Sequence, residues 1–415
     1  MVEQGLRQSF LFAIAALFAA TIAAATELPG LAAEARSILG ADQGVYIEAA
    51  DGTVLLAQAE AKAVHPASVS KVPTTLALLK RLGPDHRFTT TFTARGRVLD
   101  GTLYGDLIVS TDGDPSLVDE GALLVAKRLM ESGILRIAGS LRLQGPLIFD
   151  WHDDDGTQLR RALSGLTPPA ALAAVRALEV ASNTNDDPPG IRFATTTAWP
   201  AESIAGARVL ELRGDRPLVV LRSQALLPLV KSLNDYSNNI FKPFAAAAGG
   251  AAAVEAVARS AVPAQMRAEI TLGDAAGTDP ANRLSPRAAV KLLRALEQEL
   301  SATGHALYDI LPVAGIDDGT LHDRLNGPAE AGRVLGKTGT FGDYGASALV
   351  GAIATSDRGT VYFAILNHNV PVPQARRRQD RFVRVLLGHL HSVPWSYQRD
   401  PRPAISRAEV TLSGR

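Results

Sequence analysis

The stretch Pro66-Ala67-Ser68-Val69-Ser70-Lys71 places a serine three residues before a lysine, at the start of a segment with helical character that runs to about Leu82. Residues three apart on a helix share one face, with Cβ atoms about 5–6 Å apart, so Lys71 can reach the Ser68 hydroxyl. A serine hydroxyl becomes a good nucleophile when a neighbouring base takes its proton, and a helix N-terminus favours the negative charge that develops. Ser68 and Lys71 are therefore candidate catalytic residues. An isolated S-x-x-K pattern, however, is most often an ordinary helix start with a solvated lysine.

A second motif, Ser237-Asn238-Asn239, leads into another segment with helical character. Ser237 could relay a proton between the lysine and a leaving group, and Asn239 could hydrogen-bond a substrate amide. Both are therefore candidate catalytic residues. Taken alone, the same residue types are those preferred at a plain helix N-cap.

A third motif, Lys337-Thr338-Gly339, opens a predicted strand. Lys337 is a fixed cation suited to a substrate carboxylate, and Thr338 adds a hydroxyl donor. Glycine within a strand often marks the close approach of a ligand backbone, which makes Gly339 a further substrate-binding candidate. The backbone N–H groups of Thr340 and Ser68 could together form an oxyanion hole. The alternative for this motif alone is a lysine at an ordinary strand end.

Each motif is weak by itself, but the three in this order are specific to serine acyl-transfer enzymes. Other signals are set aside. His65 lies close to Ser68, yet no G-x-S-x-G turn surrounds that serine. The run His152-Asp153-Asp154-Asp155 is more typical of an acidic turn than of a metal site, and Arg376-Arg377-Arg378 is typical of a solvated helix face. Because Gly-rich phosphate-binding loops are also absent from the sequence, we expect neither a metal nor a cofactor.

The composition narrows the class of protein. The 415 residues include 42 Lys+Arg and 42 Asp+Glu, so the formal net charge is zero and no charge excess favours a nucleic-acid ligand. The absence of cysteine excludes disulfides, cysteine nucleophiles and thiolate metal sites. Arg7 precedes an apolar run from Phe10 to Ala25, which predicts a cleaved signal peptide over residues 1–25 and a periplasmic or otherwise exported protein. The alternative is an amphipathic or buried N-terminal helix.

Predicted strands lie early and late in the chain, with helices between them. Hairpins are predicted around Asp51-Gly52, between residues 209–212 and 217–221, and around residues 356–359. This pattern favours an α/β chain of the α+β type, in which an antiparallel sheet built from both chain ends is flanked by helices.

The same pattern predicts how the chain divides. We expect a discontinuous catalytic domain over residues 26–85 and 232–391, interrupted by an inserted accessory domain over residues 86–231. The polar segment 392–415 lacks apolar periodicity and is expected to be an extended or mobile tail.

The chain resembles the low-molecular-mass penicillin-binding proteins, and specifically the D-alanyl-D-alanine carboxypeptidase/endopeptidase family, peptidase family S13. The resemblance covers roughly Gly44 to Leu390, and the long insert between the first two motifs is itself a family trait. It implies the serine β-lactamase/DD-peptidase-like transpeptidase fold. The stretches that carry it are Pro66-Ala67-Ser68, Gly113-Asp114-Pro115-Ser116-Leu117, Tyr236-Ser237-Asn238-Asn239, Asn282-Arg283-Leu284-Ser285-Pro286-Arg287, Leu311-Pro312-Val313-Ala314-Gly315 and Gly336-Lys337-Thr338-Gly339-Thr340.

The resemblance also implies an activity. The chain is expected to be a serine-type D-Ala-D-Ala carboxypeptidase, with endopeptidase action as a further option, that cleaves peptidoglycan peptides and binds β-lactam antibiotics covalently at Ser68. One alternative is a β-lactamase or esterase on the same fold. Class A β-lactamases, however, use an additional glutamate to activate the deacylating water, and no convincing glutamate loop is present in the sequence. The other alternative is a non-catalytic wall-binding protein, against which the intact motifs argue.

Overall fold

A five-stranded antiparallel sheet joins the two ends of the chain in the computed structural model, in the order β14-β15-β16-β1-β2. The K-T-G motif therefore lies on an edge strand. The strands are β1 (Gly44–Ala49), β2 (Val54–Gln58), β14 (Val334–Phe341), β15 (Ala346–Ala354) and β16 (Thr360–His368). The structure describes residues 28–181, 189–194, 209–214, 216–234, 241–342, 345–400 and 408–412. Within these ranges, no helix is long and apolar enough to cross a membrane.

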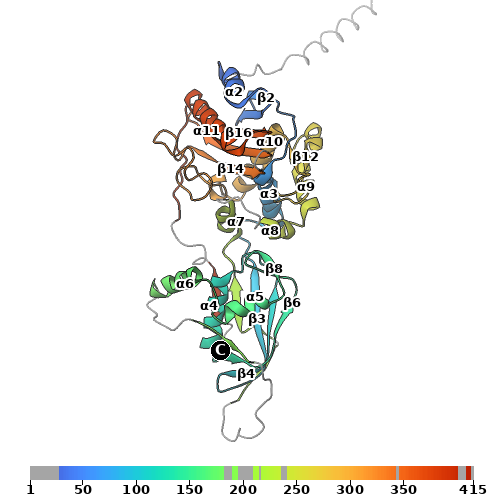
Figure 1. The fold of residues 1–415 in the computed structure, drawn as a ribbon, viewed down its shortest axis with the longest axis vertical. Helices are drawn as coiled ribbons and strands as arrows, with labels where there is room; N and C mark the ends of the chain where they lie inside the picture. Colours follow the sequence, from blue (N-terminus) through green and yellow to red (C-terminus); the bar gives the residue numbers. More distant parts are fainter. Residues whose placement is uncertain are drawn as a thin grey trace, which may run out of the picture.

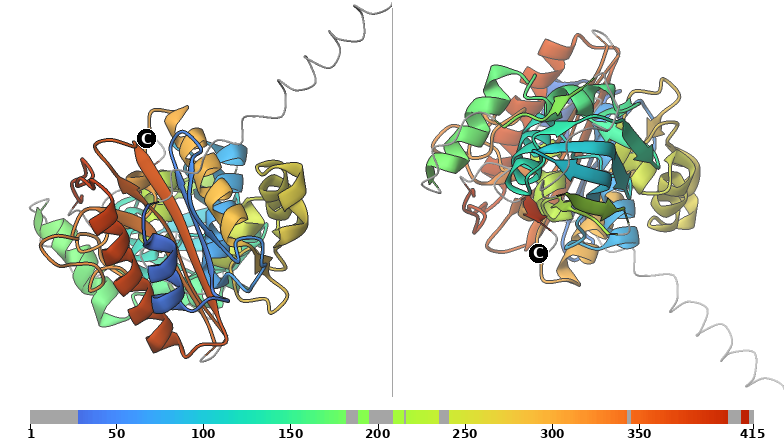
Figure 2. Two further views of the ribbon diagram at one scale, coloured as in Figure 1. Left: turned by 90° about the horizontal axis from the view of Figure 1, so that it is seen from above. Right: turned by 90° about the horizontal axis from the view of Figure 1, so that it is seen from below.

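Helices cover both faces of this sheet (Figure 2). On one face lie α2 (Leu31–Leu39) and α11 (Val372–His389); on the other lie η1 (Ala67–Ser70), α3 (Lys71–Leu82) and α10 (Pro286–Ser301). Successive residues of β1 divide between the two sides, because side chains alternate along a strand. Val45 and Ile47 pack on the α2 and α11 side, and Tyr46 packs on the α3 and α10 side. The predicted hairpins at Asp51-Gly52 and at residues 356–359 are confirmed.

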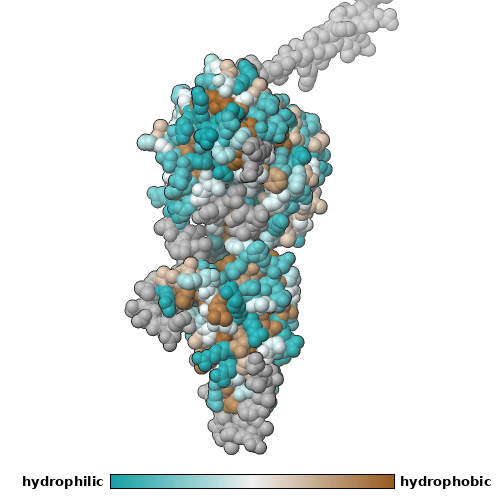
Figure 3. Space-filling model, in the orientation of Figure 1, coloured by the Kyte–Doolittle hydropathy of each residue, from teal (hydrophilic) through white to brown (hydrophobic). Residues whose placement is uncertain are grey.

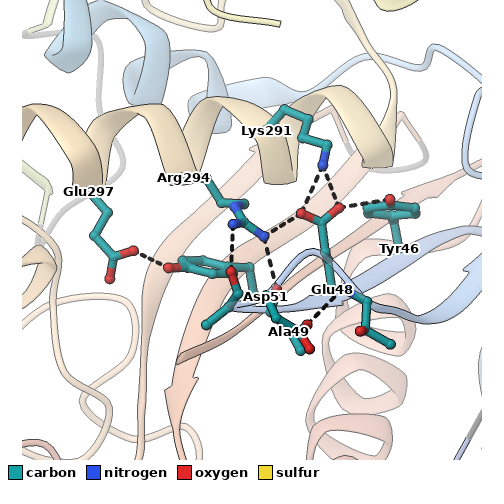
Figure 4. Close-up of polar contacts among 10 residues, drawn as sticks. Tyr46, Glu48, Ala49, Asp51, Lys291, Arg294 and Glu297 are labelled. Atoms are coloured by element: carbon teal, nitrogen blue, oxygen red, sulfur yellow. Dashed lines mark hydrogen bonds and ion pairs between the residues drawn. The ribbon is translucent and has the colours of Figure 1, made fainter. Parts of the chain in front are cut away.

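A buried carboxylate fastens α10 to the sheet (Figure 4). Glu48 of β1 is fully buried and accepts hydrogen bonds from Lys291 Nζ at 2.6 and 2.8 Å. Arg294, one turn further along α10, donates to the same carboxylate. The Tyr46 hydroxyl donates to it at 2.8 Å, and burial together with this hydrogen bond raises the pKa of Tyr46. These partners offset the cost of removing the Glu48 charge from water.

The chain between the insert and α10 is helical, as predicted. The alanine-rich stretch breaks at Gly249-Gly250, where both residues have positive φ, so it forms two helices instead of one. The elements of this region are α7 (Leu226–Asn234), α8 (Lys242–Ala247), α9 (Ala251–Ser260), η3 (Ala264–Glu269), β12 (Ile270–Thr271), β13 (Arg283–Leu284) and η4 (Leu307–Asp309).

The inserted unit has its own sheet and core and lies at one end of the elongated molecule (Figure 1). The path of its sheet is β17-β11-β3-β4-β5-β9, with β10 also paired to β3 and β6 to β4. The strands are β3 (Thr89–Leu99), β4 (Thr102–Thr111), β5 (Arg136–Ile137), β6 (Leu141–Gln144), β9 (Arg192–Phe193), β10 (Leu210–Arg213), β11 (Val219–Arg222) and β17 (Glu409–Leu412).

Helices and a short hairpin complete this unit. They are α4 (Asp119–Glu131), α5 (Thr157–Leu163), α6 (Pro169–Ala181), β7 (Leu147–Phe149) and β8 (His152–Asp154). Residues of α4 and α5 share a core with β3 and β4 that includes Phe92, Leu107 and Val125. On the face shown in Figure 3, hydrophilic side chains cover most of the described surface of both units.

Two sequence predictions for this part of the chain are wrong. Strands β10 and β11 do not form a hairpin with each other. Both pair antiparallel with β3, end to end, so they act as one interrupted strand. The segment 392–415 is not a free tail throughout, since β17 pairs with β11. In both cases the partner is a strand distant in sequence, which local patterns do not reveal.

One contact between the two units lies at the turn between β7 and β8. Asp150 and Trp151 both have positive φ, at 46° and 70°, a conformation that favours glycine or asparagine and is unusual for a bulky residue. The Trp151 ring lies 6.4 Å from the Phe244 ring of α8, centroid to centroid, and packs against the core of the catalytic unit. The insert therefore contacts the helix that follows the S-x-N motif.

Candidate active site

Ser68 and Lys71 lie in contact at the junction of η1 and α3. Lys71 Nζ donates to Ser68 Oγ at 3.1 Å. Side chains three residues apart are nearly eclipsed in a 3₁₀ turn, which brings the two groups together. Lys71 is fully buried, whereas Ser68 retains 8% exposure. A serine hydroxyl hydrogen-bonded to a buried amine is the arrangement that nucleophile activation requires.

Burial sets the charge of this lysine. It lowers the pKa of Lys71 from its usual value of 10.5 to about 8, because an ammonium loses its hydration there, and the charge of Asp274 opposes the shift. The Nζ atom also lies 5.5 Å from the centroid of the Phe241 ring. A substantial fraction of Lys71 is therefore neutral near pH 8 and able to accept a proton.

Asp274 organises the loop beside Ser68. Its carboxylate accepts hydrogen bonds from the backbone N–H groups of Gly277 and Thr278 at 2.9 and 2.7 Å, and from Asn282 Nδ2 at 2.9 Å. Partial burial opposes ionisation, but these hydrogen bonds outweigh it and hold the pKa of Asp274 well below its usual range. The loop therefore carries a permanent negative charge near Lys71.

Two glycines allow the chain to close around the turn that carries Ser68. A Cβ on Gly339 would lie 2.6 Å from the Pro66 carbonyl oxygen and 3.1 Å from Ser68 N. A Cβ on Gly277, where φ is +96°, would lie 2.8 Å from Ser68 N. Ala67, just before the serine, has a φ of 49°, a region that L-residues seldom occupy. Strand β14 and the Asp274 loop thus hold the serine backbone from two sides in a strained conformation.

The K-T-G strand presents polar groups beside this turn. Lys337 is fully buried, and its Nζ donates to the Thr338 carbonyl at 3.2 Å. Thr338 Oγ1 lies 2.7 Å from Thr320 Oγ1. The next hydroxyl along the same side of the strand, that of Thr340, accepts from Arg376 Nη2 at 2.7 Å.

His65 is part of the scaffold. The Ala67 N–H donates to its Nδ1 at 3.1 Å, so the ring proton belongs on Nε2, which lies 3.0 Å from the Asp279 carbonyl oxygen. Its ring stacks on Phe341 at the end of β14 with centroids 4.0 Å apart, and burial lowers its pKa. Both ring nitrogens are thus occupied, as expected for a histidine that is not the base.

The family profile for "D-Ala-D-Ala carboxypeptidase 3 (S13)" matches residues 25–197 and 196–387, nearly the whole chain. This chain belongs to the S13 family. It is a serine-type D-Ala-D-Ala carboxypeptidase, and because the family acts on the cell wall, an exported protein is indicated. A carboxypeptidase DacB from Mycolicibacterium smegmatis is 27% identical over 389 residues, covering 86% of this chain and 82% of that protein.

Solved structures confirm the predicted fold. A predatory endopeptidase from Bdellovibrio bacteriovorus, acylated by penicillin G, matches with a TM-score of 0.70 at 22% identity, covering 89% of this chain and 99% of that one. Penicillin-binding protein 4 from Haemophilus influenzae, complexed with a β-lactam, matches with a TM-score of 0.58 at 17% identity, covering 86% and 99%. The described part of this S13 chain thus has the architecture of the DD-peptidases.

Within this S13 site, the structure brings Ser68 and Lys71 into hydrogen-bond contact and packs the strand of Lys337, Thr338, Gly339 and Thr340 against their turn. The candidates Ser237 and Asn239 lie outside the described residues. No local pattern in the sequence indicates Thr320 or Arg376, whose partners Thr338 and Thr340 are distant in the chain, or the charge that Asp274 exerts on Lys71. Arg376 is exposed, in agreement with the predicted solvated helix face, and its guanidinium also donates to Thr340 Oγ1.

The acidic run after Trp151 has a structural role. Asp154 accepts hydrogen bonds from the backbone N–H groups of Gln158 and Leu159, and Asp155 accepts one from that of Thr157. Both carboxylates therefore bind N–H groups at the start of α5 that have no partner within the helix. Among the described residues, no group of histidines and carboxylates is arranged to hold a metal.

Proposed function

We propose that this S13 enzyme cleaves the D-Ala–D-Ala bond of peptidoglycan stem peptides through an acyl-enzyme on Ser68. The observation that supports this proposal most strongly is the 3.1 Å contact between Ser68 Oγ and the buried Nζ of Lys71. Neutral Lys71 accepts the hydroxyl proton as Ser68 Oγ bonds to the carbonyl carbon of the penultimate D-alanine. The N–H groups of Ser68 and Thr340 stabilise the oxyanion that forms.

The other motif residues complete the cycle. Ser237 relays the proton to the leaving amine, the C–N bond breaks, and the terminal D-alanine departs. Asn239 holds the peptide amide, Lys337 and Thr338 hold the terminal carboxylate, and Gly339 leaves room for the substrate backbone. Water then hydrolyses the ester and regenerates Ser68. A β-lactam acylates Ser68 in the same way. Its leaving amine, however, stays attached through the opened ring, so no leaving group departs from the adduct.

The test is covalent labelling followed by mass spectrometry. The purified protein is incubated with a labelled penicillin, and D-alanine release from a peptide ending in D-Ala-D-Ala is measured in parallel. Ser68→Ala should abolish both labelling and release, and the matched variant Ser70→Ala should retain labelling. Labelling that survives in Ser68→Ala contradicts the assignment of the nucleophile. A rapidly lost adduct points to a β-lactamase, and no adduct with the parent protein points to a wall-binding protein.

We also propose that residues 1–25 are removed on export, so that the mature protein begins near Thr26. The support is the apolar run from Phe10 to Ala25, which lies outside the described residues. Exported protein whose N-terminal sequence begins at Met1 or Val2 contradicts this proposal.

A further inference from the structure

The sheet of the insert has one covered face and one open face. Ala94 and Val98 of β3 belong to the core shared with α4 and α5, whereas Arg95 on the same strand is exposed. Because side chains alternate between the two faces of a strand, an exposed residue next to a core residue points to the open face. In the strands β3, β4, β5, β6, β9 and β10, every arginine does so. These residues, here called the arginine face, are Arg95, Arg97, Arg136, Arg142, Arg192 and Arg213.

Positive charge dominates the arginine face. The same strands contain no lysine and two acidic residues, Asp106 and Glu211. Arg142 forms an ion pair with Asp106, so that carboxylate already has a partner. Arg95 lies directly opposite Arg213 on the neighbouring strand, and like charges that face each other across two strands destabilise a sheet. This arrangement costs stability in the free protein, and an anion bound between the two guanidinium groups removes that cost.

The chemistry and spacing of this face fit a polyanion. A guanidinium is planar, stays charged, and binds a carboxylate through two parallel hydrogen bonds. Side chains on one face are about 7 Å apart along a strand and about 5 Å apart between strands, so several anionic groups can be bound at once. A membrane-binding face would add apolar side chains that enter the bilayer, but the exposed Leu210 and Leu412 lie opposite Val98 and Val219, on the core side of the sheet. A polymer in solution therefore fits this face better than a lipid surface.

We propose that the arginine face binds the free carboxylates of the peptidoglycan polymer, at a site separate from the one that cleaves it. The inference rests on the proposed function, because each stem peptide that the enzyme cleaves ends in a carboxylate and a polymer carrying many stem peptides is a polyanion. Binding through the insert raises the effective concentration of uncleaved peptides around Ser68. The partner of the insert is thus the polymer, and a short peptide in solution gains nothing from this face.

The first test measures binding by co-sedimentation with insoluble peptidoglycan that has been freed of other wall polymers. The active site is blocked beforehand with penicillin, so that binding through Ser68 makes no contribution. The double substitution Arg95→Gln and Arg213→Gln should weaken binding roughly 10-fold, the worth of two exposed charge pairs. Binding of the parent should fall with added salt and should be largely lost on peptidoglycan whose carboxylates have been converted to amides.

The second test measures D-alanine release. At low polymer concentration, the double variant should release D-alanine from the polymer more slowly, in proportion to its weaker binding, but at the parental rate from a short soluble peptide. Its thermal midpoint should not fall, because the substitutions remove a like-charge pair from an exposed face. The matched control is Arg161→Gln with Arg176→Gln, which removes two exposed arginines from α5 and α6 of the same unit. It should leave binding and both rates unchanged.

The inference is overturned by unchanged binding of the double variant, by equal binding of the parent to the amidated polymer, or by tighter binding to vesicles that contain anionic lipid than to peptidoglycan. An equal loss of activity on the polymer and on the short peptide overturns it too, since the arginines would then act on the catalytic unit. A parent enzyme that is labelled by penicillin but does not bind the polymer refutes this inference alone. A parent that is neither labelled nor releases D-alanine refutes the proposed function.

Discussion

The two units of the molecule bury their sheets differently. In the catalytic unit, helices cover both faces, and every residue of β1 is buried, as are residues 346–353 of β15. In the insert, β3 alternates between buried and half-buried residues over its first half, and large apolar residues such as Leu135 and Leu166 remain 51% and 63% exposed. A sheet with helices packed on both faces can hold a strained turn such as that of Ser68 in place. A sheet covered on one face makes fewer packing contacts that could do so.

We expect the largest effect from a substitution that pushes β14 away from the turn that carries Ser68, because this turn is held in place by that strand. In Gly339→Ala the new Cβ would meet backbone atoms of Pro66 and Ser68, which cannot move aside as a flexible side chain would. We expect acylation by a penicillin to slow by at least about 100-fold, as misplacement of catalytic groups by about 1 Å does. The control is Gly388→Ala on α11, where a Cβ meets nothing within 4 Å. Near-parental acylation by Gly339→Ala would show that the close packing is not needed.

Removing the buried charge that fastens α10 tests stability rather than chemistry. Glu48→Gln leaves Lys291 and Arg294 without their carboxylate, and we expect a loss of about 3 kcal/mol in the free energy of unfolding. The matched control is Glu299→Gln, since Glu299 forms an exposed ion pair with Lys80 and should cost less than about 1 kcal/mol. Chemical denaturation measures both. Equal losses of stability in the two variants would contradict the role given to Glu48 in fastening α10 to the sheet.

The contact between the units is tested at Trp151. Trp151→Ala removes its packing on Phe244 but keeps a side chain at positive φ. We expect this variant to lose about 2 kcal/mol of stability. Trp151→Gly loses the same packing but relieves the backbone strain, so it should be about 1 kcal/mol more stable than the alanine variant. An alanine variant at least as stable as the glycine variant would show that the strained turn carries no cost.

We expect the smallest effect from removing the charge of Asp274, which should shift the pH dependence of acylation. Asp274 raises the pKa of Lys71 against the effect of burial, so Asp274→Asn should lower that pKa. The base is active when neutral, so the rise of the acylation rate with pH should move to lower pH. Asp279→Asn, on the same loop, serves as the control, because Asp279 is not among the charges that act on Lys71. If Asp274 only shapes the loop, Asp274→Asn should lower the acylation rate at every pH without shifting the pH profile.

The contrast between the units also appears in what the sequence could predict. The Ser68–Lys71 contact follows from local spacing, and the hairpins of the catalytic sheet follow from turn residues and apolar runs. The positions of Asp274 and Arg376 depend on packing between distant segments, so no local pattern reveals them. In the insert, the apolar runs on either side of the turn between β10 and β11 predict a hairpin, yet both strands pair with β3.

The central claim is that Lys71 takes the Ser68 proton, and the acylation rate measured with a penicillin across pH tests it most directly. With the pKa of Lys71 at about 8, the neutral fraction grows as pH rises through that value, and the parent rate should rise with it. Lys71→Arg should eliminate acylation, because a guanidinium stays protonated. Lys80→Arg on the exposed side of the same helix should leave the profile unchanged. If Lys71→Arg acylates nearly as fast as the parent, another residue or a water molecule takes the proton and the account is wrong.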